Sequence, residues 1–399
     1  MDMRTCQCRN KRCHLCGKIG DESKLRQWGS DGGGEPRFRC DGCGKTHDVR
    51  DGTAYAGIRT ELKTYELGAK LLAEGNSIRG TGRILEMDKD TIDQWVIQLG
   101  EHCAKIADYH FHGLHLTECQ LDELWTFVRK KEDQLTPLEH MLGLYGDTWI
   151  WVAFAPVSKL VPAWVAGRRT LKDGKMLVKC LKNKLDGHIP FFTSDDLPHY
   201  ANVLLDVYGQ KIEPSRTGKP GRPRKSYKIP PDDLLYAVVC KRREGSRVVE
   251  VTTKVVYGSP ERIARILHDS PTSNTISTYG VERDNLTIRQ HSRRMGRKVN
   301  AFSKERDYLE HQLALSFAYY HFVIPHLGLR QRLPNPCLLT GTVRPKSGFN
   351  ARPPWRPVSP ITSGLWMNCS AFVFRQSIFA LLRFYPVKGT LPPNPAPPQ

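Results

Sequence analysis

The sequence contains no long hydrophobic run. Its longest apolar stretch, Trp149–Val157 (WIWVAFAPV), has nine residues and includes a proline. A helix that spans a bilayer needs about 20 apolar residues, so this stretch is too short to cross a membrane. No apolar segment follows the first basic residues of the chain, and we therefore expect no secretory signal. These absences argue against a membrane protein and favour a cytoplasmic one.

Acidic residues are scarce relative to basic ones. The chain has 60 Lys and Arg against 41 Asp and Glu, a formal charge of +19, and residues 331–399 contain no acid at all. Such an excess predicts attraction to a polyanion, and double-stranded DNA is the partner that we favour. The alternative is a soluble basic protein without such a partner. Because residues 331–399 also hold 13 of the 27 prolines, we expect a Pro-rich, basic and poorly ordered tail.

Composition and patterning divide the rest of the chain into three further zones. Residues 1–50 are rich in Cys, Gly and charge, and residues 60–105 have the apolar periodicity of helices. Residues 115–330 alternate strand-like and helical patterns, which predicts an α/β fold.

Six of the 12 cysteines lie within the first 43 residues, which indicates a local metal site rather than a disulfide framework. Two CxxC pairs are separated by 23 residues. Two such pairs supply the four thiolates of a tetrahedral structural Zn²⁺ site, so residues 1–50 are predicted to form a zinc ribbon. The predicted ligands are Cys13, Cys16, Cys40 and Cys43. Unrelated free or disulfide-bonded cysteines are the alternative, and Cys6 and Cys8 are left unassigned.

Within residues 60–105, predicted to be a helix-turn-helix DNA-binding domain, residues 74–100 have the helix-turn-helix pattern, for which an ordinary helical hairpin is the alternative. Ser77 can cap a first short helix, and Asp88 or Asp90 can cap a second one after the turn. The second helix has one apolar stripe, formed by Ile92, Trp95, Val96 and Leu99. Three polar residues would be left exposed to DNA: Lys89, Gln94 and Gln98.

Three carboxylates are predicted to lie near strand ends, where open α/β sheets commonly have their ligand-binding and active sites. Asp122 lies in a strand-like segment, and Asp195 ends an apolar strand that should neighbour it. Glu282 heads the basic segment Tyr279–Lys298. Two aspartates and a glutamate supply the oxygen ligands that two Mg²⁺ (or Mn²⁺) ions need for phosphodiester chemistry. The alternative is that each acid is a solvated surface charge.

The basic residues that follow Glu282 are predicted to bind DNA beside it. On a continuous helix, Arg289 and Arg293 would share a face with Glu282, so cations would hold DNA phosphates while the acid holds a metal ion. The predicted phosphate-binding residues of this segment are Arg289, Arg293, Arg294, Arg297 and Lys298.

Three segments resemble the DDE transposases of the insertion-sequence-one (IS1-like) family: LDELWTFV, TSDDLPHY and YGVERDNLTIRQHSRRMGRKVNAFSK. The resemblance runs from about Cys13 to Leu329 and implies a ribonuclease H-like catalytic core behind the zinc ribbon and helix-turn-helix. It implies that Asp122, Asp195 and Glu282 are catalytic. The implied activity is Mg²⁺-dependent cleavage and strand transfer at the ends of an insertion sequence. A homo-oligomer on DNA, associated with the nucleoid of a prokaryotic host, is also implied.

The chain departs from the family at three places. Asp284 replaces a usual histidine, which would place another negative charge beside the metal ions. Asp196 stands where glycine commonly follows the second aspartate, and the acid-free tail is unlike the family's ending. Two alternatives therefore stay open: an inactive copy that acts as a DNA-binding repressor, and a metal-dependent nuclease on the same core.

Residues 206–258 are predicted to be a basic insertion between the second and third acids. Within it, RTGKPGRPRKSYK resembles an AT-hook, in which Arg222 and Arg224 would bind the minor groove. A charged linker is the alternative.

Overall fold

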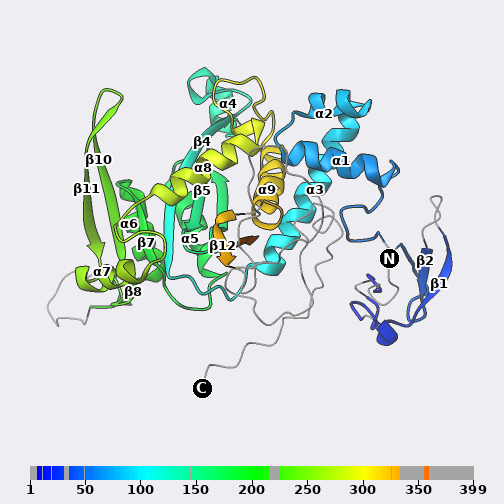
Figure 1. Ribbon diagram of the computed structural model, residues 1–399, viewed down its shortest axis with the longest axis horizontal. Helices are drawn as coiled ribbons and strands as arrows, with labels where there is room; N and C mark the ends of the chain where they lie inside the picture. Colours follow the sequence, from blue (N-terminus) through cyan, green and yellow to red (C-terminus); the bar gives the residue numbers. More distant parts are fainter. Residues whose placement is uncertain are drawn as a thin grey trace, which may run out of the picture.

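The structure is a computed structural model (Figure 1). It describes residues 7–10, 12–18, 20–30, 36–48, 50–143, 145–214, 225–324, 326–332 and 355–358. The described part is a mixed α/β structure, as the sequence predicts.

A six-stranded mixed sheet is the centre of the molecule, with the strand order β11-β10-β7-β4-β5-β6. Strands β4, β5 and β6 are antiparallel neighbours, β7 and β10 run parallel to β4, and β11 is antiparallel to β10. The strands are β4 (Glu118–Val128), β5 (Gly146–Ala155), β6 (Leu160–Gly167), β7 (Phe191–Asp195), β10 (Tyr236–Glu244) and β11 (Arg247–Tyr257). A turn at residues 156–159 separates β5 from β6.

Part of the predicted insertion belongs to this sheet. Residues 236–257 form β10 and β11, so the prediction that 206–258 is wholly an insertion is wrong. The start of β10, Tyr236–Val239, is buried and pairs with β7. The far end of the β10–β11 hairpin, in contrast, is exposed and projects beyond the sheet (Figure 1). This mixture of buried and charged residues within one hairpin explains why its sequence resembles an insertion.

Helices cover both faces of the sheet. Trp151, Phe192 and Tyr200 pack between one face and the helices α5 and α6, whereas Val281 and Phe317 pack α8 and α9 on the other. These helices, and the neighbouring α7, are α5 (Leu171–Lys182), α6 (Pro198–Tyr208), α7 (Pro260–Asp269), α8 (Tyr279–His291) and α9 (Arg306–Phe322). Pro198 occupies the first turn of α6, where its missing N–H costs nothing.

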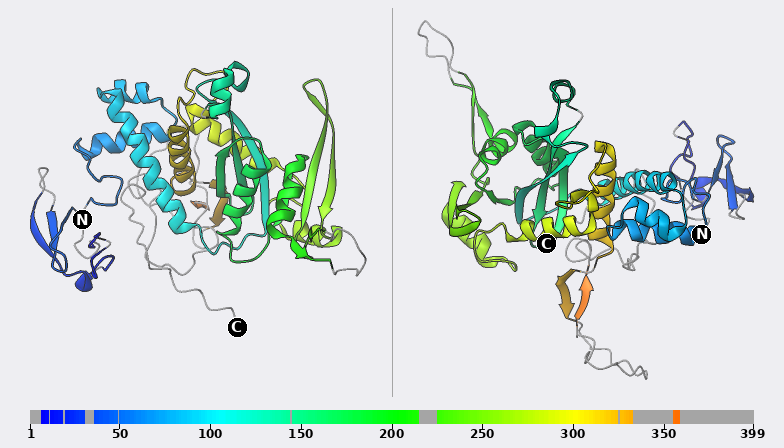
Figure 2. Two further views of the ribbon diagram at one scale, coloured as in Figure 1. Left: turned by 180° about the vertical axis from the view of Figure 1, so that it is seen from behind. Right: turned by 90° about the horizontal axis from the view of Figure 1, so that it is seen from above.

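Three helices precede the sheet: α1 (Leu62–Ala73), α2 (Ile78–Leu85) and α3 (Lys89–His110). The caps agree with the sequence, because Ser77 accepts a hydrogen bond from the Gly80 N–H and Asp88, not Asp90, caps α3. The apolar stripe predicted for α3 is buried, with all four members at most 2% exposed. It packs against α1 and against Leu315 of α9. Figure 2 shows α3, in cyan, running beside α9. Helix α9 therefore joins the helical region to the sheet.

The remaining elements are short. The N-terminal region contains a 3₁₀ turn and an antiparallel sheet of order β1-β2-β3. These are η2 (Gly20–Ser23), β1 (Leu25–Ser30), β2 (Pro36–Cys40) and β3 (Thr46–Asp48). The others are η3 (Glu132–Gln134), α4 (Pro137–Leu142), β8 (Gln210–Ile212), β9 (Tyr227–Ile229), η4 (Arg293–Met295), β12 (His326–Arg332) and β13 (Trp355–Val358).

Strand β13 lies in the predicted poorly ordered tail and pairs with β12. Residues 333–354 and 359–399 of that tail lie outside the described residues. No helix in the described ranges has the length and apolar character needed to cross a membrane.

Candidate functional site

Two of the predicted acids lie on adjacent parallel strands. The register pairs Leu121 of β4 with Ser194 of β7, so the next residues, Asp122 and Asp195, are neighbours where β7 ends. Helix α8 crosses this edge and is fixed there by Gln120, whose Oε1 accepts a hydrogen bond of 2.8 Å from the backbone N–H of Val281. Glu282 is the next residue. The parallel pairing and this helix contact together bring the three acids to one place.

The electrostatics of Asp122 reflect this placement. The pKa of Asp122 is raised to about 7, chiefly by burial and also by the negative charges of Glu123, Asp195 and Glu282, against a backbone hydrogen bond that lowers it. The Asp122 Oδ2 atom accepts a hydrogen bond of 2.6 Å from Nδ2 of Asn285, one turn beyond Glu282. Asn285 was not among the predicted site residues, although its i+3 spacing from Glu282 places it on the same face of a helix.

The three carboxylates are not drawn together into a closed ligand set. Among the described residues, one group of three or more His, Cys, Asp or Glu side chains has ligand atoms that all lie within 4.8 Å of one another. This group consists of cysteines, so the three carboxylates are further apart than this. Glu282 is instead bound by two donors through its Oε1 atom, the Lys241 ammonium and the Thr278 hydroxyl at 2.7 Å. Burial raises the pKa of Glu282, but these two hydrogen bonds outweigh it and leave that pKa lowered.

Asp195 has an unused oxygen. Its Oδ1 atom is buried and has no hydrogen-bond partner among the described residues, and burial raises its pKa, with a further contribution from Glu123. A buried carboxylate oxygen without a donor is costly unless a cation or water is bound there. The neighbouring Asp196 is exposed and interacts with Cys240, so Asp195 is the aspartate beside Asp122.

A fourth carboxylate, that of Glu123, is buried on the other side of the sheet from the three predicted acids. Its side chain is 2% exposed and lies on the opposite face of β4 from Asp122. The Arg169 guanidinium donates to its Oε1 atom at 2.6 and 3.0 Å, and the Tyr200 hydroxyl donates to Oε2 at 2.8 Å. These donors fix the Glu123 carboxylate behind the strand that carries Asp122.

Asp284 is not beside the acids. It is 3% exposed and lies on the face of α8 that meets α9, where burial raises its pKa to about 7 against a smaller opposing effect of the Tyr320 hydroxyl. The expectation that Asp284 would add charge next to the metal ions is therefore wrong. The reason is helical geometry, because residues two apart on a helix point about 200° away from each other.

The basic segment is not one continuous helix. Helix α8 ends at His291 and the 3₁₀ turn η4 follows, so Arg293 does not share a helical face with Glu282, contrary to the prediction. Arg289 donates to the backbone carbonyls of Met295 at 2.6 Å and Trp125 at 3.3 Å.

The other cations of this segment differ in what they contact. Arg293 bonds the Gly75 carbonyl and Arg294 bonds the Ser303 hydroxyl, each at 3.3 Å. Arg297 and Lys298 are exposed.

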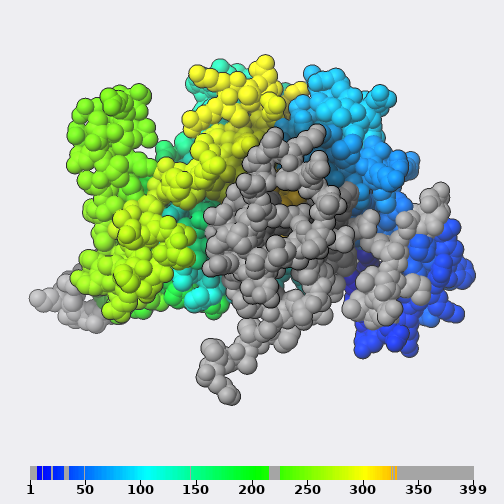
Figure 3. Space-filling model, in the orientation of Figure 1, coloured from blue at the N-terminus to red at the C-terminus, as the bar shows by residue number. Residues whose placement is uncertain are grey.

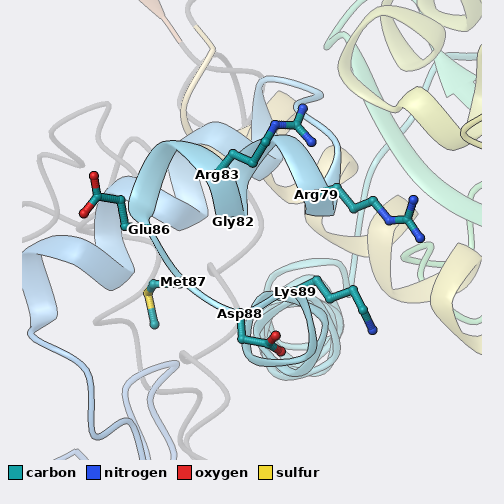
Figure 4. Close-up of a pocket in the computed structure, with 7 residues that line it drawn as sticks. All are labelled: Arg79, Gly82, Arg83, Glu86, Met87, Asp88 and Lys89. Carbon is teal, nitrogen blue, oxygen red and sulfur yellow. The ribbon is translucent and has the colours of Figure 1, made fainter.

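A groove of about 530 Å³ lies between α2 and α3 (Figure 4). Arg79 of α2 and Lys89 of α3 point to the same side of it, and Arg83 extends from the next turn of α2. Gln94 is exposed, as predicted. Gln98 is half-buried and its Nε2 atom donates to the Ala56 carbonyl at 2.6 Å, so its predicted exposure is wrong. Arg79 and Arg83 were not among the predicted DNA-binding residues, although their i,i+4 spacing places them on one face of α2.

Four cysteines cluster in the N-terminal region, with Sγ atoms all within 4.8 Å of one another. They are Cys8, Cys13, Cys40 and Cys43. The set is close enough to bind a metal ion and is consistent with zinc. Three of the predicted ligands are present, but Cys8 replaces Cys16, whose side chain is exposed.

The local backbone explains the exchange of ligands. Cys8 and Cys16 form an isolated parallel β-bridge, and the Gly17 N–H donates to the Cys8 carbonyl at 3.0 Å. This pairing turns the Cys8 side chain inward, where it is 1% exposed. The partner of Cys13 in the cluster is therefore Cys8 and not Cys16.

Arg222 and Arg224, the residues predicted to form an AT-hook, lie outside the described residues. Comparison with known proteins adds no further assignment, because neither a protein-family model nor a curated protein matches this chain.

Proposed function

We propose that the protein is a DNA transposase that cleaves DNA at the ends of an insertion sequence and joins them to target DNA. The observation that carries this proposal is the meeting of Asp122, Asp195 and Glu282, from two parallel strands and a crossing helix, close enough for the two other acids to act on the pKa of Asp122. An isolated surface acid would not need such a placement.

The donor set fits Mg²⁺ or Mn²⁺. All three residues offer carboxylate oxygens, and the buried Asp195 Oδ1 atom has no other partner in the described part of the chain. Asp122, Asp195 and Glu282 would hold the metal ions, which when bound would activate the attacking oxygen and stabilise the leaving one. The protein's own contribution is positional: Asn285 orients Asp122, and the Arg169–Glu123–Tyr200 network fixes the sheet behind it.

The sheet supports a ribonuclease H-like interpretation of the core. Three antiparallel strands, β4 to β6, are followed by β7, which joins the other edge of β4 in parallel, and by β10, which pairs in parallel with β7. The acids stand on the first and fourth of these strands and on a later helix, the order expected for that fold. Strand β11 extends this arrangement.

Helices α2 and α3 support a helix-turn-helix, and the cysteine cluster supports a zinc ribbon before it. The basic side chains of Arg79, Arg83 and Lys89 line the groove between the two helices (Figure 4). In Figure 3 the yellow surface that includes α8 lies between the β10–β11 hairpin, in green, and the light-blue helices. A DNA duplex bound along this side would contact the helices and the carboxylate site together.

The proposal is tested by strand transfer in Mg²⁺, with DNA ends from the native flanks of this gene. Wild type should join ends to target DNA. Asp195→Asn and Glu282→Gln should abolish joining and leave end binding largely intact, whereas Asp196→Asn should stay active. Equal loss of binding and joining in the first two variants would contradict metal-ligand roles.

A DNA-binding repressor is the second candidate. The observation that favours it is that the carboxylates lack a closed ligand arrangement, with Lys241 bound to Glu282. End binding without joining by wild type would support the repressor, and cleavage without joining would support a nuclease.

A further inference from the structure

Lys241 is a cation among the proposed catalytic acids, and its side chain is only 26% exposed. It lies on β10, where Val239 is level with Asp195 of β7. Two residues further along the strand, Lys241 is on the same face as Val239, toward α8. There its Nζ atom donates to Oε1 of Glu282.

The same ammonium acts on a second acid. The strand register places Lys241 two residues beyond Val239, the neighbour of Asp195, and its positive charge opposes the rise in the pKa of Asp195. Arg243, further along the same strand, also acts on Glu282. The β10–β11 hairpin therefore places positive charge beside Asp195 and Glu282, two of the proposed metal ligands.

We propose that Lys241 competes with the metal ion for Glu282 and, once displaced, binds a phosphate of the DNA substrate. This inference rests on the proposed function and adds a positioning residue to it. A divalent cation on Glu282 repels an ammonium on the same oxygen. The long flexible stem of lysine lets Nζ move away, and a DNA phosphate beside the site is the anion that it then meets.

Metal binding by the DNA-free protein tests the first half. Mn²⁺ is titrated by calorimetry into the zinc-loaded full chain. Lys241→Met, which keeps the stem and loses the charge, should bind Mn²⁺ on the order of tenfold more tightly. Glu282→Gln should bind it more weakly. Lys254→Gln is the matched control, since Lys254 is exposed on β11 and pairs with Val238, on the opposite face of the hairpin from Lys241.

DNA binding tests the second half. Affinity for the element ends is measured against salt concentration in Ca²⁺. Lys241→Met should reduce the slope of log affinity against log salt by about 1, and Lys241→Arg should restore it. Thermal unfolding checks that each variant is folded, and Lys241→Gln replaces Lys241→Met if that variant is not.

The outcomes separate this inference from the proposed function. If Glu282→Gln weakens Mn²⁺ binding and the Lys241 variants leave it unchanged, the competition is absent and the inference is overturned while the function stands. If neither changes Mn²⁺ binding, Glu282 is not a ligand and both are overturned. If Lys241→Met binds Mn²⁺ more tightly but wild type shows no strand transfer, the competition between Lys241 and the metal ion for Glu282 is supported. In that case only the proposed transposase activity is contradicted.

Discussion

Asn285 and Asp122, 163 residues apart in the sequence, are joined by a hydrogen bond of 2.6 Å from the Asn285 amide to the Asp122 carboxylate. This bond connects α8 to β4 at the carboxylate site. It occupies one oxygen of Asp122, and it sets the position of the helix turn that carries Glu282. A single amide thus connects the Asp122 carboxylate to the helix that carries Glu282.

Removing this amide should slow the reaction more than it weakens DNA binding. We expect Asn285→Ala to lower the rate of DNA cleavage by about 10- to 100-fold, the range found when a partner of a metal ligand is removed. Asn202→Ala is the matched control, since the Asn202 amide contacts only the carbonyl of Pro198 in its own helix, at 3.4 Å, among the described residues. Single-turnover cleavage and end-binding assays measure the two effects. Unchanged cleavage by Asn285→Ala would remove its positioning role.

Local patterns account for the parts of the fold that were predicted. The stripe of α3 and the caps at Ser77 and Asp88 depend on neighbouring residues, and the acid at the end of β7 follows its apolar run. Lys241 and Asn285 could not be found in this way. Each meets an acid far away in the chain, and only the register of β10 with β7 and the crossing of α8 over β4 bring them together.

The zinc ligands illustrate the same limit. CxxC spacing favours Cys16, because it assumes that both thiolates of a pair come from one tight turn. The backbone pairing of residues 8 and 16 turns Cys16 outward and Cys8 inward. No local spacing rule reports a pairing of this kind.

Metal content distinguishes these two sets of ligands. We expect about one zinc ion per chain in wild type and in Cys16→Ser, and loss of the zinc in Cys8→Ser, which lacks one of the four clustered thiolates. Elemental analysis of the purified chains, after dialysis against a weak chelator, measures the content. Zinc lost from Cys16→Ser and kept by Cys8→Ser would restore the CxxC assignment.

Exposed cations of the helical region should determine DNA affinity. Arg79→Ala and Arg83→Ala should each weaken end binding and lower its salt slope by about 1, because each removes one phosphate contact. Gln98→Ala should instead lower thermal stability, since its amide bonds the Ala56 carbonyl. Fluorescence anisotropy at several salt concentrations and thermal unfolding measure these effects. A salt slope unchanged in both arginine variants would place the DNA elsewhere.

Asp284 should make the stability of the protein depend on pH. Its carboxylate is buried, and its pKa is about 7 when folded against 3.8 as the ordinary value. The unfolded chain therefore loses this proton at lower pH than the folded one. The contribution to stability is greatest below pH 4, falls as the pH rises, and is lost once the pH passes 7. The full difference is on the order of 4 kcal/mol, from 1.36 kcal/mol for each pKa unit.

Asp284→Asn should therefore be more stable than wild type at pH 8, with the difference shrinking toward pH 5. Urea unfolding at several pH values measures it, and the exposed Asp133→Asn serves as the control that removes a carboxylate without removing a buried one. A constant difference across this pH range would mean that Asp284 keeps an ordinary pKa in the folded protein. In that case water or an unrecognised donor must reach its carboxylate between α8 and α9.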